Sequence, residues 1–266
     1  MAYKKEWFNE ERFWEAYAPI MFDPQHWEEV SLVADGVTRL AQLNLYDEKR
    51  LQNSGSGTPG PWALDMCCGF GRITLELARR GFTATGVDIT QSYLQTAQED
   101  AAYEHLDIEF IHADVRSFRR PHFFDVVTNL YISFGYFENP DHDRLVVQNA
   151  YESLKPGGAF IVETLGKEIA VRDFVDREWF TRAGLTILTE YTPVDSWGGL
   201  KNRWILLNKG GECLERTFTQ RLYAATELRR LLLDAGFASV ELYGDWNDGV
   251  YDNRAQILIA VGRKAP

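Results

Sequence analysis

Residues 63–81, ALDMCCGFGRITLELARRG, contain the feature that most constrains the fold of this chain. A short apolar run is followed by Gly69 and Gly71 and then by helical spacing, which predicts a strand, a tight turn and a helix. Turns of this kind direct backbone N–H groups at the start of the helix toward a nucleotide. The dinucleotide fingerprint G-x-G-x-x-G needs a third glycine, but Thr74 stands at that position. The turn therefore indicates a ligand with a nucleotide part without selecting a dinucleotide.

From Trp62 onward, short apolar runs alternate with segments of helical spacing. This order predicts the α/β class, with a parallel sheet covered by helices on both faces. The LKPGG stretch at residues 154–158 marks a turn just before the fifth strand. The expected strands are residues 62–66, 83–88, 108–112, 124–130 and 159–165, and the expected helices between them are residues 71–80, 91–103 and 141–154.

After the fifth strand the alternation stops, and three strand-like runs follow one another. The SWGG and NKGG stretches that separate them are typical of antiparallel hairpins. A helix and two strands then resume the α/β pattern. The order predicts one α/β domain with a small inserted sheet, and the alternative is a separate second domain. The inserted strands are expected at residues 185–195, 200–208 and 212–222, the later helix at 226–235 and the last strands at 238–243 and 255–262.

The N-terminal part predicts two helices, at residues 7–18 and 26–43, with Pro19 and Pro24 breaking the chain between them. Residues 52–61, QNSGSGTPGP, predict a loop because Gly, Pro and Ser do not propagate regular structure. The expected organisation is an N-terminal helical cap over residues 1–50 and a main domain over 51–266, with the antiparallel insert at about 166–224.

The composition limits the classes of partner. Lysine and arginine total 28 against 39 aspartate and glutamate residues, which gives a formal net charge of −11. Nucleic-acid backbones are bound mainly through Lys and Arg, so we expect no nucleic-acid partner. The chain has no run of about 18 apolar residues that predicts a membrane span, and MAYKKEW at its start lacks the apolar core of a signal peptide. We therefore expect a cytoplasmic protein without a membrane partner.

The three cysteines are Cys67, Cys68 and Cys213. Their number and spacing fit neither a disulfide framework nor a metal site, so we predict no bound metal. We interpret the adjacent pair as small packing residues in the turn rather than as nucleophiles.

Two acidic residues follow the pattern of an adenosine-binding fold. Asp65 lies four residues before Gly69, and Asp88 closes the second expected strand. A carboxylate at the end of that strand accepts hydrogen bonds from ribose hydroxyls in α/β folds. Enzymes that use NAD share this feature, so an NAD(P)-dependent oxidoreductase stays open as an alternative.

The acidic-x-x-x-Gly-x-Gly pattern of residues 65–71 resembles motif I of the class I S-adenosylmethionine-dependent methyltransferases. Asp88, Asp114 in IHADVRSF, and the runs FDVVTNLYISFGYF and SLKPGGAFIVET are similar to the later motifs of that family, in the same order. The resemblance covers about residues 60–165, and the AGF helix end with the final hairpin extends it to the end of the chain. It implies a Rossmann-like seven-stranded methyltransferase sheet with an antiparallel insert after strand five. It also implies S-adenosyl-L-methionine as cofactor and S-adenosyl-L-homocysteine as product.

The same resemblance implies the cofactor contacts. Asp114 would accept the adenine amine with Val115 against the ring, and a carbonyl of Asn129 or Leu130 would meet the ammonium group. Arg72 would reach the cofactor carboxylate, because guanidinium and carboxylate match in geometry; the alternative is an ordinary solvated helix residue. The complete predicted cofactor set is Tyr17, Asp65, Cys67, Gly69, Gly71, Arg72, Asp88, Ile89, Asp114, Val115, Asn129 and Leu130.

The resemblance also bears on the reaction. Methyl transfer from a sulfonium needs no metal, since the protein has only to hold nucleophile, carbon and sulfur in line. The insert is similar in position to that of glycine N-methyltransferase and the amino-sugar N,N-dimethyltransferases, where it forms a substrate lid or a dimer contact. We predict transfer to a small-molecule acceptor, preferably at nitrogen, with oxygen and carbon as alternatives. A non-catalytic S-adenosylmethionine-binding module is a further alternative, and a homodimer through the insert is left open.

Ligands of open α/β sheets bind beyond the carboxyl ends of the strands, which selects the acceptor candidates. Glu163, at the end of strand five, and Tyr131, after strand four, are the predicted catalytic residues. Of the five histidines, only His26 and His142 are placed where a general base could reach the site, and a surface role is the alternative. The predicted substrate-binding residues are Phe134, Tyr136, Arg203 and Trp204, while Tyr17 on the N-terminal helix closes over the cofactor.

Overall fold

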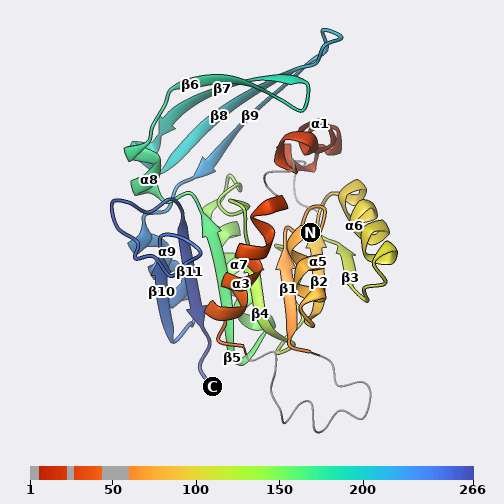
Figure 1. The fold of residues 1–266 in the computed structure, drawn as a ribbon. Coiled ribbons are helices and arrows are strands. Elements are labelled where there is room, and N and C mark those ends of the chain that lie inside the picture. Colours follow the sequence, from red (N-terminus) through yellow and green to blue (C-terminus); the bar gives the residue numbers. More distant parts are fainter. Residues whose placement is uncertain (1–5, 23–26, 44–59) are drawn as a thin grey trace.

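The computed structural model describes residues 6–22, 27–43 and 60–266, and it contains two β-sheets. The larger sheet has seven strands in the order β10-β11-β5-β4-β1-β2-β3, parallel from β5 to β3 and antiparallel at β10 and β11 (Figure 1). This architecture confirms the predicted α/β class and the predicted Rossmann-like sheet of seven strands. The strands are β1 (Trp62–Met66), β2 (Thr83–Asp88), β3 (Glu109–His112), β4 (Phe124–Asn129), β5 (Leu154–Thr164), β10 (Ser239–Tyr243) and β11 (Leu258–Arg263).

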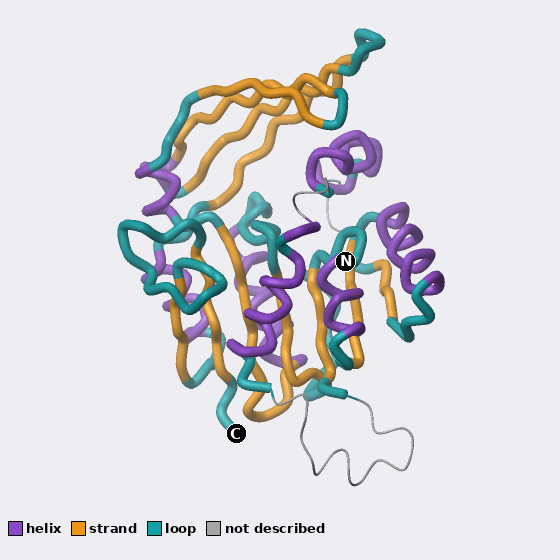
Figure 2. Tube along the Cα trace, in the orientation of Figure 1, coloured by secondary structure: helices purple, strands orange, loops and turns teal. Residues whose placement is uncertain are grey.

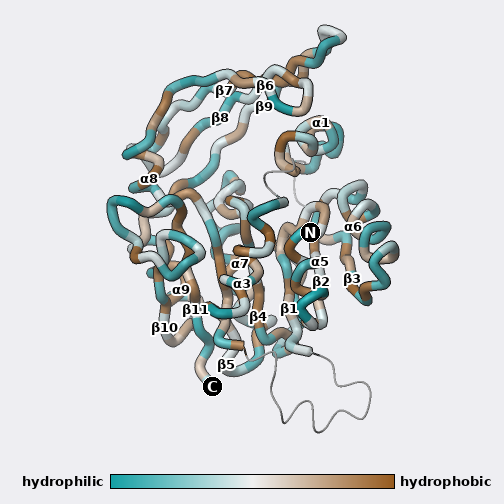
Figure 3. The backbone as a smooth tube through the Cα atoms, viewed as in Figure 1, coloured by the Kyte–Doolittle hydropathy of each residue, from teal (hydrophilic) through white to brown (hydrophobic). Residues whose placement is uncertain are grey.

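The central strands are apolar on both faces, because helices cover each face of a parallel sheet. Along β4, Val126 packs on one side with α3 and α5, and Val127 packs on the other with α7 and α9. Helix α6 packs against β2 and β3. Figure 3 shows hydrophobic segments along the central strands and mixed hydropathy along the outer helices. The helices are α3 (Val30–Leu40), α5 (Arg72–Arg79), α6 (Gln91–Tyr103), α7 (Pro140–Ser153) and α9 (Ala225–Asp234).

The smaller sheet, here called the insert sheet, comprises residues 177–221 and follows strand five, as predicted. It lies beyond the carboxyl ends of the parallel strands (Figures 1 and 2). Its four antiparallel strands are β6 (Arg177–Arg182), β7 (Leu185–Val194), β8 (Gly199–Leu207) and β9 (Cys213–Arg221), preceded by the short helix α8 (Lys167–Arg172).

Strand β6 and helix α8 were not predicted from the sequence. The β6 segment REWFTR contains three charged residues, and its Trp179 side chain is 72% exposed. The segment is an edge strand whose partner is β7, so it does not need a continuous apolar face. Hydrophobic alternation therefore gives little signal for this strand.

The N-terminal segment forms the short helix η1 (Trp7–Asn9) and then α1 (Glu11–Met21), which lies between the insert sheet and the larger sheet (Figure 1). The predicted break at Pro19 is wrong, because the helix continues for two more residues. Ile20 is 3% exposed and packs with Ile187 of the insert sheet, and this contact stabilises the last turn despite the missing N–H group of Pro19. Pro24, His26 and nearly all of the predicted 52–61 loop lie outside the described residues.

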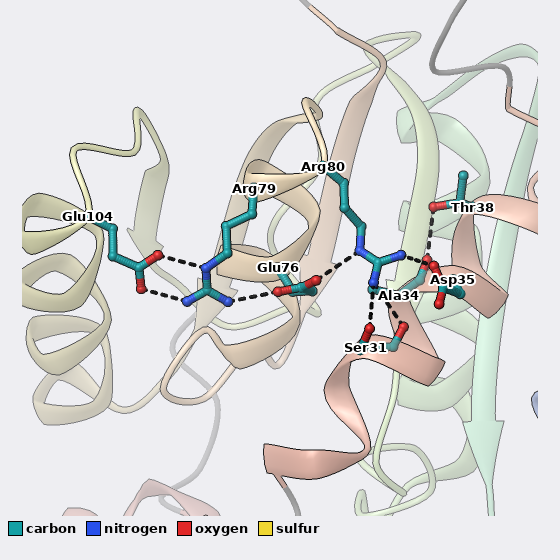
Figure 4. A network of polar contacts seen from close by, with 8 residues as sticks. All are labelled: Ser31, Ala34, Asp35, Thr38, Glu76, Arg79, Arg80 and Glu104. Carbon is teal, nitrogen blue, oxygen red and sulfur yellow. Dashed lines mark hydrogen bonds and ion pairs between the residues drawn. The ribbon is translucent and has the colours of Figure 1, made fainter.

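Helix α3 is fixed to the main domain by a network of charged side chains (Figure 4). Arg80, directly after α5, forms an ion pair with Asp35 of α3 and a 3.0 Å hydrogen bond to Ser31, while Glu76 accepts from both Arg79 and Arg80. These exposed contacts individually contribute little stability, and they add to the apolar packing of α3 against α5. The position of α3 brings Glu29, the residue before α3, to the edge of the cavity described next.

Candidate functional site

A cavity of about 820 Å³ lies between the carboxyl ends of the parallel strands, helix α1 and the insert sheet. Its floor is formed by the turn between β1 and α5 and by the segments that follow β2, β3 and β4. Its roof is formed by α1, α8 and the inner face of the insert sheet. Parts of the chain that are far apart in sequence therefore enclose one space, at the edge where α/β folds bind ligands.

The glycine turn has the strained backbone expected where main chain approaches a ligand closely. Cys67 has φ 62°, Gly69 has φ 56° and Gly71 has φ 72°, all in the left-handed region. For Cys67 this conformation is costly, so it persists only where the surrounding structure enforces it. Cys67, Cys68 and Gly69 line the cavity, and burial raises the pKa of both thiols, which keeps them protonated. Protonated thiols are poor nucleophiles, and the assignment of the cysteines as packing residues stays a prediction.

Thr74 explains why the turn has no third glycine. Its hydroxyl donates a 2.8 Å hydrogen bond to Asp65, which accepts a second one, 3.0 Å long, from Thr128. Asp65 is 4% exposed and lines the cavity, and burial raises its pKa to about 6. A threonine at this position thus fixes a buried carboxylate beneath the turn.

Asp88 connects the end of β2 to the glycine turn. Its carboxylate accepts hydrogen bonds from the backbone N–H groups of Gly69, at 2.9 Å, and of Thr90, at 2.8 Å. The side chain lines the cavity with Ile89, and burial raises its pKa. Asp88 therefore fixes the turn and also presents a carboxylate to the cavity.

Asp114 and Val115 line the same end of the cavity after β3. The Asp114 carboxylate is held by Arg116, whose Nη2 lies 2.6 Å from Oδ2. Val115 is 7% exposed and presents an apolar side chain beside it. A flat heterocycle with an exocyclic amine fits such a pair of neighbours.

The segment after β4 brings the predicted catalytic residues together. Tyr131 and Ile132 have φ values of 52° and 60°, and both line the cavity. The Tyr131 N–H donates a 3.0 Å hydrogen bond to Oε2 of Glu163, which is 4% exposed. Burial raises the pKa of Glu163 to about 7, against the lowering effect of this hydrogen bond and of Arg72. The Arg72 guanidinium lies 3.6 Å from the centroid of the Tyr131 ring.

Aromatic side chains form the opposite wall. Tyr17 of α1 stacks on Trp204 of the insert sheet with ring centroids 4.5 Å apart, and Tyr136 lines the cavity beside them. Tyr191 also lines it and donates a 3.4 Å hydrogen bond to Glu178.

Sequence reasoning missed several residues on the inner face of the insert sheet. These are Glu178, Arg182, Tyr191, Asn202 and Gln220. One of them could have been found from the period of two along a strand, because Trp204 and Asn202 are two residues apart and therefore lie on the same face of the sheet.

Two predicted cofactor residues do not line the cavity. Gly71 is the N-cap of α5 and contributes the shape of the turn rather than a wall. Asn129 is 1% exposed, and its Nδ2 donates a 3.1 Å hydrogen bond to the carbonyl of Met66, so its amide fixes β4 to β1.

Two predicted substrate residues also lie elsewhere, which corrects those assignments. Phe134 is 2% exposed and packs in the core, with its ring 5.5 Å from that of Tyr223. Arg203 faces the outer side of the insert sheet and pairs there with Glu190 and Glu215. The alternation that turns Trp204 inward turns its neighbour Arg203 outward.

His142, one of the two histidines considered as a general base, opens α7 but is absent from the cavity lining. Its Nδ1 lies 3.1 Å from Nη1 of Arg116. Within the described ranges, no group of three or more His, Cys, Asp or Glu residues is arranged to hold a metal ion. A search of the same residues finds no helix with the length and apolar character that a bilayer crossing requires.

Residues 63–158, which contain the glycine turn, strands β2 to β4 and parts of β1 and β5, match the family described as "Methyltransferase domain". Together with the relatives below, this match and the fold identify the chain as an S-adenosylmethionine-dependent methyltransferase. The cofactor of this class is S-adenosylmethionine.

Among curated proteins, a putative methyltransferase from Geobacillus sp. (strain WCH70) is 23% identical over 206 residues, which are 76% of this chain and 83% of that protein. The ubiquinone biosynthesis O-methyltransferase of Idiomarina loihiensis is 30% identical over 121 residues, 45% of this chain and 48% of that protein. The chain thus spans about half the length of this second relative.

Solved structures share the whole fold. The CcbJ methyltransferase from Streptomyces caelestis superposes with a TM-score of 0.72 at 19% identity, covering 90% of each chain. The sugar N-methyltransferase KedS8 from Streptoalloteichus sp. superposes with a TM-score of 0.66 at 16% identity, covering 100% of this chain and 97% of that one. At these low sequence identities, the similarity to the two solved structures shows a shared fold and nothing further.

Proposed function

We propose that this chain transfers a methyl group from S-adenosylmethionine to the nitrogen of a small-molecule amine. The observation that carries the proposal is the excess of acidic over basic side chains in the cavity wall. Its described lining contains seven carboxylates but two guanidinium groups, those of Arg72 and Arg182. Such a wall favours a sulfonium and an amine, because both are cationic or become so during transfer. The seven carboxylates belong to Glu29, Asp65, Asp88, Asp114, Glu163, Asp173 and Glu178.

The floor of the cavity supports one orientation of the cofactor. The adenine would lie against Val115 with its amine toward Asp114, and the ribose hydroxyls would donate to Asp88. The methionine part would follow the turn from Cys67 to Gly69, where the backbone permits close approach. In this orientation Leu130 lies along the same wall, and Arg72 is the cation on the floor for the cofactor carboxylate.

The methyl group would then point toward the aromatic wall. The acceptor nitrogen attacks the methyl carbon with its lone pair as the carbon–sulfur bond breaks, giving S-adenosylhomocysteine and a methylated ammonium product. Holding the three atoms in line supplies most of the rate, as a proximity effect. Glu163 is the group placed to accept a proton from the amine, since its pKa of about 7 suits a base near neutral pH.

Tyr131 contributes to this step in two ways. Its backbone N–H orients the Glu163 carboxylate, and its hydroxyl is a buried polar atom without a hydrogen-bond partner among the described residues. A buried hydroxyl without a partner is costly, which supports a role for it toward a bound ligand.

The roof provides the acceptor side. The rings of Tyr136, Tyr191 and Trp204 offer aromatic surface for cation–π contact with an ammonium group, and Tyr17 supports Trp204 by stacking on it. This arrangement supports the division into an N-terminal cap, residues 1–50, and an insert at about 166–224 that together close a main domain over residues 51–266.

Transfer to oxygen is the second candidate. A carboxylate with a raised pKa could also deprotonate a hydroxyl, and the ubiquinone biosynthesis relatives are named O-methyltransferases. In favour of transfer to nitrogen, one structural neighbour is described as a sugar N-methyltransferase and another as an amino pentose methyltransferase.

The test uses S-adenosylmethionine with a labelled methyl group and paired acceptor libraries, in which each amine has an alcohol of the same shape. We expect label in the amines and not in the matched alcohols, read by mass spectrometry of the products. Label confined to the alcohols would overturn the assignment to nitrogen in favour of oxygen.

A further inference from the structure

Arg116 is a buried cation that the proposed reaction does not use. Its side chain has no solvent exposure, and it lies between two carboxylates from different parts of the chain. Its Nη2 is 2.6 Å from Oδ2 of Asp114, after β3, and its Nη1 is 2.5 Å from Oε2 of Glu6, before η1. One guanidinium therefore connects the proposed adenine site to the N-terminal segment.

Aromatic rings enclose the same guanidinium. Its central carbon is 5.4 Å from the centroid of Phe8 and 4.7 Å from that of Phe137, and these two rings meet edge to face at 5.5 Å. Phe8 and Phe137 both line the cavity. The contacts of Arg116 thus hold Phe8, and with it the segment of residues 6–9, against the ligand space.

We propose that Arg116 is a positioning residue that couples occupancy of the adenine site to closure of the N-terminal segment over it. Lifting residues 6–9 away would separate Glu6 from a buried cation and expose the ring contacts of Phe8. Breaking a buried ion pair by removing one partner is strongly unfavourable, so the segment opens rarely. We therefore expect the Glu6–Arg116 pair to slow the departure of a ligand that lies against Phe8. The inference rests on the proposed role of Asp114 in adenine binding.

The experiment measures the two rate constants of S-adenosylhomocysteine binding by stopped-flow fluorescence, with Trp7 and Trp14 of the N-terminal segment as reporters. Glu6→Gln removes the charge of the pair but keeps the side-chain shape. Glu152→Gln makes the same change in the exposed pair with Arg119 and serves as the matched control. Thermal unfolding of each ligand-free variant shows that it is folded.

We expect Glu6→Gln to dissociate S-adenosylhomocysteine at least about fivefold faster than the wild type, and Glu152→Gln to match the wild type. Arg116→Lys keeps the charge but loses the bidentate contact, and it should weaken equilibrium binding about tenfold. A purely structural ion pair would change the unfolding temperature of Glu6→Gln and leave its dissociation rate at the wild-type value.

The outcomes separate this inference from the proposed function. If the wild type binds S-adenosylhomocysteine but Glu6→Gln releases it no faster, the coupling is refuted and the cofactor site stands. If the wild type does not bind S-adenosylhomocysteine, the proposed function itself fails.

Discussion

The carboxylate of Glu163, near the end of β5, accepts a 3.0 Å hydrogen bond from the backbone N–H of Tyr131, just after β4. The donor belongs to the main chain in a left-handed conformation, with φ 52°. The strained backbone after β4 therefore fixes the direction of a buried acid that lines the cavity.

We predict that Glu163→Gln lowers the turnover number about 100-fold, because general-base catalysis contributes roughly 10²–10⁴-fold. The amide keeps the shape and can still accept from Tyr131, so the affinity for S-adenosylhomocysteine should stay near the wild-type value. Steady-state kinetics and calorimetry measure the two effects. Equal turnover would remove Glu163 from the reaction.

The raised pKa of Glu163 predicts that the activity depends on pH. Because the pKa of Glu163 is raised to about 7, the wild-type turnover should rise as the pH increases through this value and then level off. The Gln variant has no proton to lose at this position, so its profile should be flat over the same range. A variant profile with the same inflection would assign the titration to another group.

Stability should show the opposite trend in the ligand-free protein. Burial raises the pKa of Glu163 to about 7 and that of Asp65 to about 6. At a pH between the unfolded-state pKa and the raised folded-state pKa of either group, the folded protein holds a proton that the unfolded protein has released. The free energy of unfolding therefore falls as the pH rises through this window, and the contribution present at lower pH is lost by about pH 7. Denaturant titrations should show this fall in the wild type and a smaller one in Glu163→Gln. A wild-type unfolding free energy that rises over this window would contradict the assignment.

The part of the site that sequence reasoning found is the part fixed by local chain order. Asp65, Asp88 and Asp114 each lie within two residues of the carboxyl end of a parallel strand, and such ends meet at one edge of the sheet. Their positions follow once the strands are recognised. The stabilising role of Thr74 was not predicted, because it depends on the distance between a helix side chain and a strand side chain.

The aromatic wall gives a prediction for the acceptor. Trp204→Ala removes the ring that stacks on Tyr17, and loss of a cation–π partner costs about 1–2 kcal/mol in a desolvated site. The KM for the amine should rise about tenfold while S-adenosylhomocysteine binds nearly as before. Trp179→Ala, on the exposed outer face of the same sheet, is the matched control and should leave both unchanged. An equal effect of both substitutions would indicate general damage to the insert sheet.

Asp88 gives a prediction for the cofactor. Asp88→Asn should weaken S-adenosylhomocysteine binding by about 1.5–3 kcal/mol, the value of charge-assisted hydrogen bonds to the ribose. Calorimetry measures this loss, and Asp107→Asn on an exposed loop controls for the change in net charge. Unchanged affinity in Asp88→Asn would place the ribose elsewhere.

The contact between the end of β9 and helix α7 gives a prediction for stability. Asp143 of α7 has no solvent exposure, accepts a 2.7 Å hydrogen bond from the hydroxyl of Tyr223 and pairs with Arg221 at the end of β9. Asp143→Asn should lower the free energy of unfolding by about 1–3 kcal/mol, because it leaves a charged partner poorly satisfied. Asp141→Asn, in the exposed pair with Arg144, should change it little. Equal denaturation midpoints for Asp143→Asn and the wild type would show that Asp143 does not anchor the insert sheet.

The errors in the sequence-based site have physical causes. Arg203 and Trp204 are neighbours on one strand, so they face opposite sides of the insert sheet and cannot both contact the acceptor. Phe134 follows β4 as Tyr131 does, but loop geometry that no local pattern encodes turns it into the core. Glu178 was missed because its strand, β6, has no continuous apolar face to reveal it.

The most direct test of the central claim is a crystal structure of the protein grown with S-adenosylhomocysteine. The account predicts the adenine against Val115, the ribose hydroxyls within hydrogen-bond distance of Asp88, and the sulfur directed toward Glu163 and the aromatic wall. A nucleoside bound outside the cavity, or a cavity that stays empty at saturating ligand, would contradict it.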